Sequence, residues 1–173
     1  MPADADFYAL ELLLDDQDRT LLHRVRAFMA KEVQPIINHY WTRARFPHEL
    51  LPGLAELHIA GLPYAGYGCP GKSPLLDGMV AMELARTDPS IATFMGVHGG
   101  LAMGSIYLCG SEEQKRRWLP AMARMELLGA FGLTDPRSAP APPAAWPPPP
   151  AATATPGCWR GTRSGSATPA SPT

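Results

Sequence analysis

The feature that most constrains the fold is an abrupt change of composition at Arg137. From Arg137 to Thr173 the chain holds ten prolines and nine alanines, with no Leu, Ile, Val, Met or Phe. Such a segment cannot bury enough apolar surface to offset the conformational entropy that folding removes. We therefore predict a disordered Pro/Ala-rich tail over residues 137–173 and a foldable body that ends near Pro136.

Charge and cysteine usage exclude several classes of function. The tail contains three of the 15 basic residues and none of the 16 acidic ones, so the body has a net charge of −4. No basic stripe with interleaved aromatic residues is present, which argues against a nucleic-acid partner. Cys69, Cys109 and Cys158 lack CxxC spacing and accompany no histidine cluster, so we expect no metal site. The amino terminus lacks the basic-then-apolar order of a signal peptide, and we expect a cytoplasmic protein.

Apolar periodicity predicts that the body is mainly α. Apolar residues at spacings of three and four follow Asp15 and Asp16, and Pro35 is expected to interrupt this first helix. Further helices are predicted over residues 47–58, 74–87 and 90–110, with an irregular loop over 61–73. A capping box from Ser111 to Gln114 predicts one more helix start. We therefore expect a helical bundle over residues 1–126.

The end of the body predicts a change of architecture. The short apolar run Leu127–Leu133 is typical of one terminal strand. A single strand needs a partner for its backbone hydrogen bonds. Residues 127–136 are therefore interpreted as the start of a further domain.

Residues 90–110 carry no charged side chain over a length that could nearly cross a bilayer. The segment also contains five glycines and the polar side chains of Ser90, Thr93, His98 and Ser105. A helix that is apolar on all sides can equally be the central helix of a bundle. We favour that interpretation and expect no membrane contact.

Two sets of polar residues in the helices could carry chemistry. His98 lies among glycines and could face a substrate cavity, but a hydrogen-bonded core histidine is the more common arrangement. Glu83, Arg86 and Asp88 could form a catalytic cluster, although at helical spacing they are more typical of a solvated, ion-paired face.

Three motifs occur in the body in a particular order. They are Met82–Ser90 (MELARTDPS), Cys109–Lys115 (CGSEEQK) followed by Trp118-Leu119-Pro120, and Gly129–Pro136 (GAFGLTDP). Together they resemble the acyl-CoA dehydrogenase family over about Leu10–Pro136, with the short-chain and glutaryl-type members the most similar. The resemblance implies the amino-terminal helical bundle of that family, followed by the start of its flavin-binding β-domain at residues 127–136.

The third motif implies a cofactor site. A strand end with alternating backbone donors and the Thr134 hydroxyl can hydrogen-bond the polar edge of an isoalloxazine, while Phe131 and Leu133 offer apolar walls. Without the resemblance, the same residues are only a strand end with a Thr-Asp-Pro turn. With it, Phe131, Leu133 and Thr134 are the expected FAD-binding residues of a flavoprotein.

The family activity implied is oxidoreductase chemistry of fatty acid metabolism, the α,β-dehydrogenation of an acyl-CoA thioester. An electron-transferring flavoprotein takes the electrons, and we expect a homo-oligomer. In the family the catalytic carboxylate lies in a carboxy-terminal bundle, so no catalytic residue is assigned here. In glutaryl-specific relatives an arginine occupies the region that here holds Ile91-Ala92-Thr93, which disfavours a dicarboxylate substrate.

The family motif departs from its pattern directly after Pro136. A Gly-Ser-Asp is expected there, whereas Arg137-Ser138-Ala139-Pro140 follows, so Ser138 is not assigned the family's serine role. We interpret the tail as the product of a frameshift in GC-rich coding DNA, which resequencing would test. The expectation is a truncated fragment without activity of its own. The alternative is a non-catalytic helical interaction module.

Overall fold

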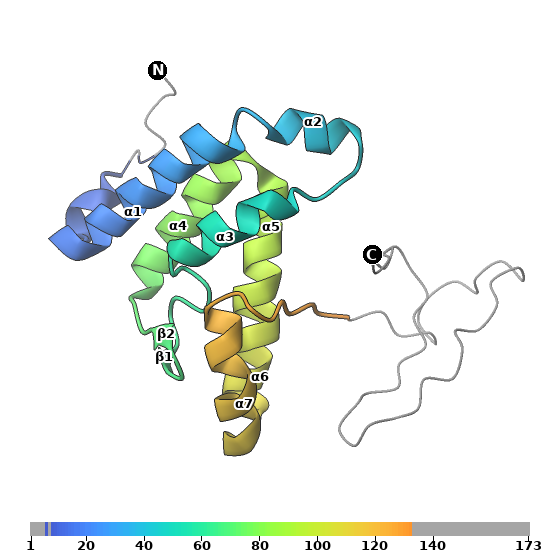
Figure 1. Cartoon of the computed structure of the whole chain (residues 1–173). Helices are drawn as coiled ribbons and strands as arrows, with labels where there is room; N and C mark the ends of the chain where they lie inside the picture. Colours follow the sequence, from blue (N-terminus) through green and yellow to red (C-terminus); the bar gives the residue numbers. More distant parts are fainter. Residues whose placement is uncertain (1–5, 7, 133–173) are drawn as a thin grey trace, which may run out of the picture. The chain divides into compact units, whose positions relative to one another are not determined.

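The computed structural model describes Asp6 and residues 8–132. The predictions for residues 133–173, among them the disordered tail and the roles of Leu133 and Thr134, lie outside the described residues. The described part is mainly helical, as the sequence predicts, with one small two-stranded hairpin (Figure 1).

The first predicted helix begins and ends where the sequence indicates. The Asp15 carboxylate accepts a hydrogen bond from the Asp18 N–H at 2.8 Å, which caps the helix start. The chain turns at Pro35, which has no N–H to continue the helix. The elements of this part are η1 (Leu10–Leu13), α1 (Asp16–Phe28), η2 (Met29–Val33, π-helical) and α2 (Ile37–Thr42).

The predicted helix over residues 47–58 forms in two pieces, a 3-10 turn and a short α-helix. These are η3 (His48–Leu50) and α3 (Leu51–Glu56). Leu50, Leu54 and Leu57 are buried, so the apolar side of this stretch faces the core.

Residues 61–73 contain a hairpin, so the prediction of an irregular loop was wrong there. The strands β1 (Ala65–Gly66) and β2 (Cys69–Pro70) pair in antiparallel register. Tyr67 and Gly68 connect them, with φ of 54° and 80°. Two successive positive φ angles make the type I′ turn that two-residue hairpins favour.

Two long helical segments follow and match their predicted ranges. The first is α4 (Pro74–Thr87), and the second is one helix in three parts: α5 (Pro89–Met95), η4 (Gly96–Met103, π-helical) and α6 (Gly104–Cys109). By length and composition alone Pro89–Cys109 could cross a bilayer, and core helices pass the same test. In this structure α5 packs against α4, and α6 against α7.

The last helix, α7 (Glu112–Ala123), starts at the predicted capping box. The Ser111 N–H donates to Gln114 Oε1 at 2.9 Å, and the Gln114 N–H donates to Ser111 Oγ at 3.2 Å. Beyond α7 the predicted terminal strand is not formed over residues 127–132. The physical reason is that the described residues offer this segment no neighbouring strand with which to pair.

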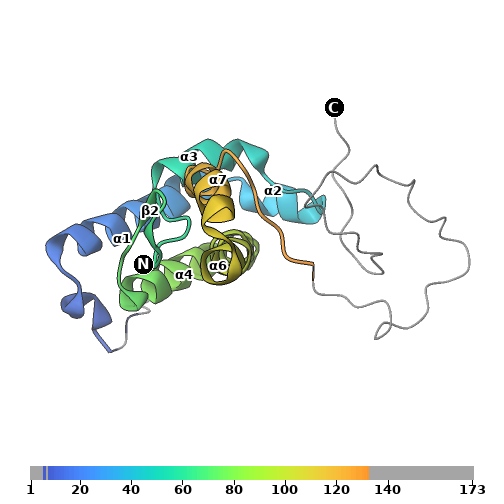
Figure 2. The ribbon, with the colours of Figure 1, turned by 90° about the horizontal axis from the view of Figure 1, so that it is seen from below.

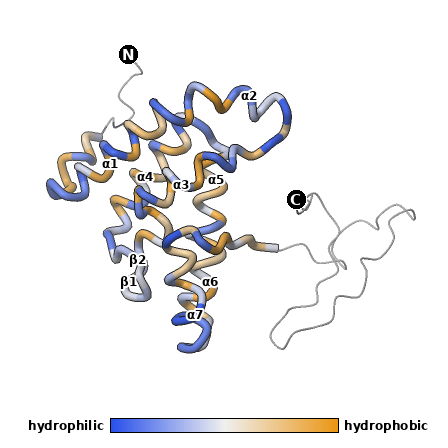
Figure 3. Tube along the Cα trace, in the orientation of Figure 1, coloured by the Kyte–Doolittle hydropathy of each residue, from blue (hydrophilic) through white to orange (hydrophobic). Residues whose placement is uncertain are grey.

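The core lies where α1 and α4 pack together and α4 packs on α5 (Figures 1 and 2). Figure 3 shows that the hydrophilic residues gather on the outside, for example at the start of α7. The largest completely buried apolar side chains come from most of the helices: Leu22, Met29, Leu54, Leu62, Leu76, Ile91, Met103 and Leu119.

Candidate functional site

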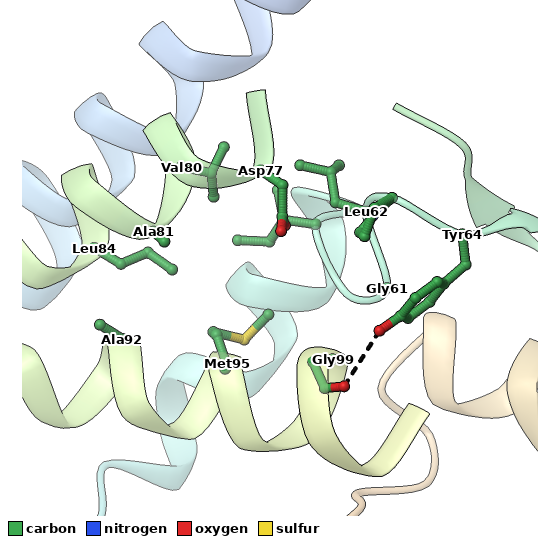
Figure 4. Close-up of a pocket in the computed structure, with 14 residues that line it drawn as sticks. Gly61, Leu62, Tyr64, Asp77, Val80, Ala81, Leu84, Ala92, Met95 and Gly99 are labelled. Atoms are coloured by element: carbon green, nitrogen blue, oxygen red, sulfur yellow. Dashed lines mark hydrogen bonds between the residues drawn. The ribbon is translucent and has the colours of Figure 1, made fainter. Parts of the chain in front are cut away.

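A cavity of about 130 Å³ lies between α4 and the α5–η4 helix (Figure 4). We call it the α4–η4 cavity. Its lining is mostly apolar and comes from residues 59–64, from α4 and from the first two parts of the long helix: Ile59, Gly61, Leu62, Pro63, Tyr64, Asp77, Val80, Ala81, Leu84, Ala92, Met95, Gly96, Gly99 and Gly100.

Glycines on η4 keep the α4–η4 cavity open. A Cβ at Gly96 or Gly100 would meet no atom within 4 Å, so larger side chains there would occupy open space. Gly99 has a different role, because a Cβ there would lie 3.1 Å from the Gly61 backbone nitrogen. The π-helical geometry of this stretch is itself typical of functional sites.

Two polar side chains reach the α4–η4 cavity. Figure 4 shows the Asp77 carboxylate pointing from α4 toward the space above η4. Partial burial raises the pKa of Asp77, and its carboxylate makes no hydrogen bond or ion pair within the described residues. On the other side the Tyr64 hydroxyl donates to the Gly100 carbonyl at 3.2 Å. An acyl group entering here would meet apolar walls and one acidic group.

A second, more open hollow of about 410 Å³ lies beside the segment that follows α7. We call it the Phe131 hollow. The described residues that line it are all uncharged: Ala102, Ser105, Ile106, Trp118, Met122, Leu127, Leu128, Gly129, Ala130 and Phe131. Apolar and aromatic walls fit one side of a flat ring system such as isoalloxazine. The apolar wall expected from Leu133 and the hydroxyl contact expected from Thr134 lie outside the described residues.

Of the predicted flavin residues, the structure therefore describes only Phe131. Its side chain is 44% exposed at the edge of the hollow. The sequence did not indicate Asp77 or Tyr64. Asp77 could have been found, because it shares one helical face with Val80, Ala81 and Leu84 at spacings of three, four and seven.

His98 is a core histidine, as the more common of the two interpretations predicts. Its side chain is completely buried, and both ring nitrogens are hydrogen-bonded. It does not line the α4–η4 cavity.

Within the predicted cluster, Glu83 and Arg86 form an ion pair, but Glu83 and Asp88 are buried and not solvated. Glu83 is 3% exposed and accepts hydrogen bonds from Arg26 Nη2 at 2.6 Å and Arg86 Nη1 at 3.3 Å. Asp88 is also buried and caps α5 by accepting from the Ile91 N–H at 2.9 Å. These carboxylates therefore hold helices in place.

Comparison with known families matches most of the described chain. Residues 15–126 match the family model described as acyl-CoA dehydrogenase, N-terminal domain. A short-chain specific acyl-CoA dehydrogenase from Clostridium acetobutylicum is 28% identical over 130 residues, which are 75% of this chain and 34% of that protein. The chain thus spans about a third of the length of the curated relatives it matches.

Solved structures agree with this match. A glutaryl-CoA dehydrogenase from Mycobacterium smegmatis in complex with FADH2 is 37% identical, with a TM-score of 0.69, over 75% of this chain and 34% of that one. A butyryl-CoA dehydrogenase from Megasphaera elsdenii is 28% identical, with a TM-score of 0.66, over 73% of this chain and 34% of that one.

Proposed function

Because the chain belongs to the acyl-CoA dehydrogenase family through residues 15–126, we propose that it provides the helical domain of an FAD-dependent acyl-CoA dehydrogenase. The reaction is the α,β-dehydrogenation of an acyl-CoA thioester. The structural observation that carries this proposal is the apolar α4–η4 cavity inside the matched domain.

The α4–η4 cavity is proposed to receive the acyl chain. Its walls include the side chains of Ile59, Leu84 and Met95, which belong to the buried core. Each methylene of an acyl group that leaves water for such an environment contributes about 0.8 kcal/mol. Apolar walls thus suit the short or medium unbranched acyl groups that we propose as substrates.

A dicarboxylate substrate is disfavoured on two grounds. No arginine occurs in Ile91-Ala92-Thr93, and the described lining of the cavity contains no basic residue. Asp77 would also place a second carboxylate near the distal end of such a substrate, and like charges at close range repel. Glutaryl-CoA is the substrate named for the similar mycobacterial enzyme, and in this chain we propose a monocarboxylic acyl group instead.

The Phe131 hollow is proposed to be this chain's side of the flavin site. Phe131 and Leu133 are assigned the apolar walls, and the Thr134 hydroxyl and the backbone donors of the strand end are assigned the polar contacts. Bound FAD supplies the acceptor for the hydride. The described lining of the hollow holds no carboxylate, and we assign no general base to it.

Partners follow from the same assignment. An electron-transferring flavoprotein is proposed as the electron acceptor of the complete enzyme. A homo-oligomer is proposed as its assembly, because the exposed side chains of Leu101, Leu108 and Phe131 leave apolar surface uncovered. A non-catalytic interaction module is the less favoured alternative, since the family match accounts for the cavity without it.

The proposal can be tested by titrating the ¹⁵N-labelled 173-residue chain with butyryl-CoA and following amide shifts. Gly96→Leu should fill the α4–η4 cavity, because open space lies where its side chain would be built. Gly78→Leu is the matched control, since Gly78 on α4 also has open space around it but does not line the cavity.

Butyryl-CoA is expected to shift the Gly99 and Gly100 amides in the wild-type chain and in the Gly78→Leu control, but not in Gly96→Leu. Free CoA should leave these amides unchanged. Equal shifts in all three chains, or no shift in any, would overturn the assignment of the cavity.

A further inference from the structure

His98 lines neither the α4–η4 cavity nor the Phe131 hollow. It lies on η4, its side chain is completely buried, and the Phe94 ring stacks near it with centroids 6.2 Å apart. Its Nε2 is 3.0 Å from the Met122 carbonyl oxygen. The Gly129 N–H donates to its Nδ1 at 3.0 Å.

These two bonds determine the protonation of the ring. A carbonyl oxygen can only accept, so Nε2 must carry the proton and donate to Met122. A backbone N–H can only donate, so Nδ1 must be unprotonated to accept from Gly129. Only the neutral imidazole protonated at Nε2 satisfies both contacts.

The two contacts join three parts of the chain. Met122 lies in the last turn of α7, and its carbonyl oxygen accepts from the Met125 N–H at 2.9 Å as well as from His98. Gly129 lies in the segment that leads away from α7 to Phe131. One imidazole on η4 therefore holds both the end of α7 and the start of the following segment.

Gly129 reaches His98 only because it lacks a side chain. A Cβ at this position would lie 2.5 Å from the Cβ of Ala102 and 2.7 Å from the Cε of Met122. Atoms at those distances would have to move apart. A larger residue would lift the segment off η4 and separate the Gly129 N–H from His98.

We infer that His98 is a positioning residue for the flavin side of the site, which fixes residues 127–131, and with them Phe131, against η4 through its paired hydrogen bonds to Met122 and Gly129. This inference rests on the proposed function only for the assignment of Phe131 to the flavin site. The two hydrogen bonds of His98 to Met122 and Gly129 lie within this chain and need no bound cofactor.

Protonation would release the anchor. With both ring nitrogens protonated, Nδ1 becomes a donor and faces the Gly129 N–H, which then has no acceptor. Burial lowers the pKa of His98, and the bond to the Met122 carbonyl opposes this in part. In the described part of the chain the ring contacts Phe94 of α5, Met122 of α7 and Gly129 of the following segment, and none of these residues is ionisable.

The test is hydrogen exchange of the Gly129 amide in the ¹⁵N-labelled full chain, expressed as protection relative to an unstructured peptide at the same pH. Wild type should protect Gly129 at pH 7 and lose that protection on acidification, before the amides of α1 and α4 lose theirs. His98→Ala should lower the protection of Gly129 roughly tenfold, as expected for one lost hydrogen bond, with α1 and α4 unchanged.

His98→Gln is the conservative variant, because its amide carries one donor and one acceptor but does not titrate. It should retain protection at Gly129 at both pH values. The inference is overturned if Gly129 is equally protected in His98→Ala, or if all amides lose protection together in every variant and on acidification of wild type. Because neither flavin nor acyl-CoA is present, this result is independent of whether the cavity binds an acyl group.

Discussion

Replacing Glu83 by Gln should destabilise the chain more than any comparable surface substitution. The Glu83 carboxylate is 3% exposed and accepts from Arg26 Nε at 3.1 Å, from Arg26 Nη2 at 2.6 Å and from Arg86. The hydrogen bond to Glu83 is the main cause that raises the pKa of the Arg26 guanidinium. Glutamine removes the charge and turns one acceptor into a donor that faces a guanidinium.

The size of the effect follows from burial. Removing one member of a buried ion pair costs about 3–5 kcal/mol. The Arg26 and Arg86 side chains are 35% and 24% exposed, so water can solvate them in part. We therefore expect a loss of about 2–3 kcal/mol in the free energy of unfolding, or roughly 6–15 °C in Tm.

Urea unfolding followed by far-UV circular dichroism measures this loss from the shift in midpoint at constant slope. The control is Glu32→Gln, because the Glu32–Lys31 pair is exposed, with side chains 49% and 84% accessible. That change should cost less than about 0.5 kcal/mol. If Glu83→Gln and Glu32→Gln proved equally mild, burial of the Glu83 pair would not stabilise the packing of α1 on α4.

Three further predictions concern pH, specificity and activity. Burial lowers the pKa of His98 below its ordinary 6.5, so on acidification the unfolded chain takes up the proton before the folded chain does. The free energy of unfolding should therefore be constant above about pH 6.5 and fall as the pH drops toward the lowered pKa. In His98→Gln it should stay constant over this range. Asp77→Asn removes a like charge and should strengthen glutaryl-CoA binding about 3–10-fold while leaving butyryl-CoA unchanged, measured by calorimetric titration; equal effects on both would contradict its assigned role. The chain alone with FAD, short and medium acyl-CoAs and an artificial electron acceptor should show no turnover above a flavin-only blank; turnover abolished by Thr134→Val would overturn this.

The helices could be predicted because their starts are local. Asp15, Ser73 and Ser111 each accept a hydrogen bond from the backbone N–H three residues on, so a short stretch of sequence contains both partners. The helix ranges follow from these caps and from apolar spacing. The hairpin was missed because its turn depends on a positive φ at Tyr67, a residue type that does not favour one.

The burial of Glu83 could not be predicted from its neighbours in sequence. Arg86 is three residues away and suggests an exposed helix face, whereas Arg26 lies 57 residues away on α1 and is brought to Glu83 only by packing. The α4–η4 cavity depends on long-range contacts in the same way. Gly99 must pack on Gly61 before the open space at Gly96 and Gly100 becomes a cavity.

The central claim is that the α4–η4 cavity holds the acyl chain of an acyl-CoA, and the most direct measurement is a nuclear Overhauser experiment on the chain with bound butyryl-CoA. Met95 and Leu84 line the cavity and carry methyl groups, whereas Ile106 and Trp118 line the Phe131 hollow. Cross-peaks from the terminal butyryl methyl to the Met95 and Leu84 methyls are the predicted result. Cross-peaks to Ile106 and Trp118 instead, or none to the cavity from a ligand that is shown to be bound, would contradict it.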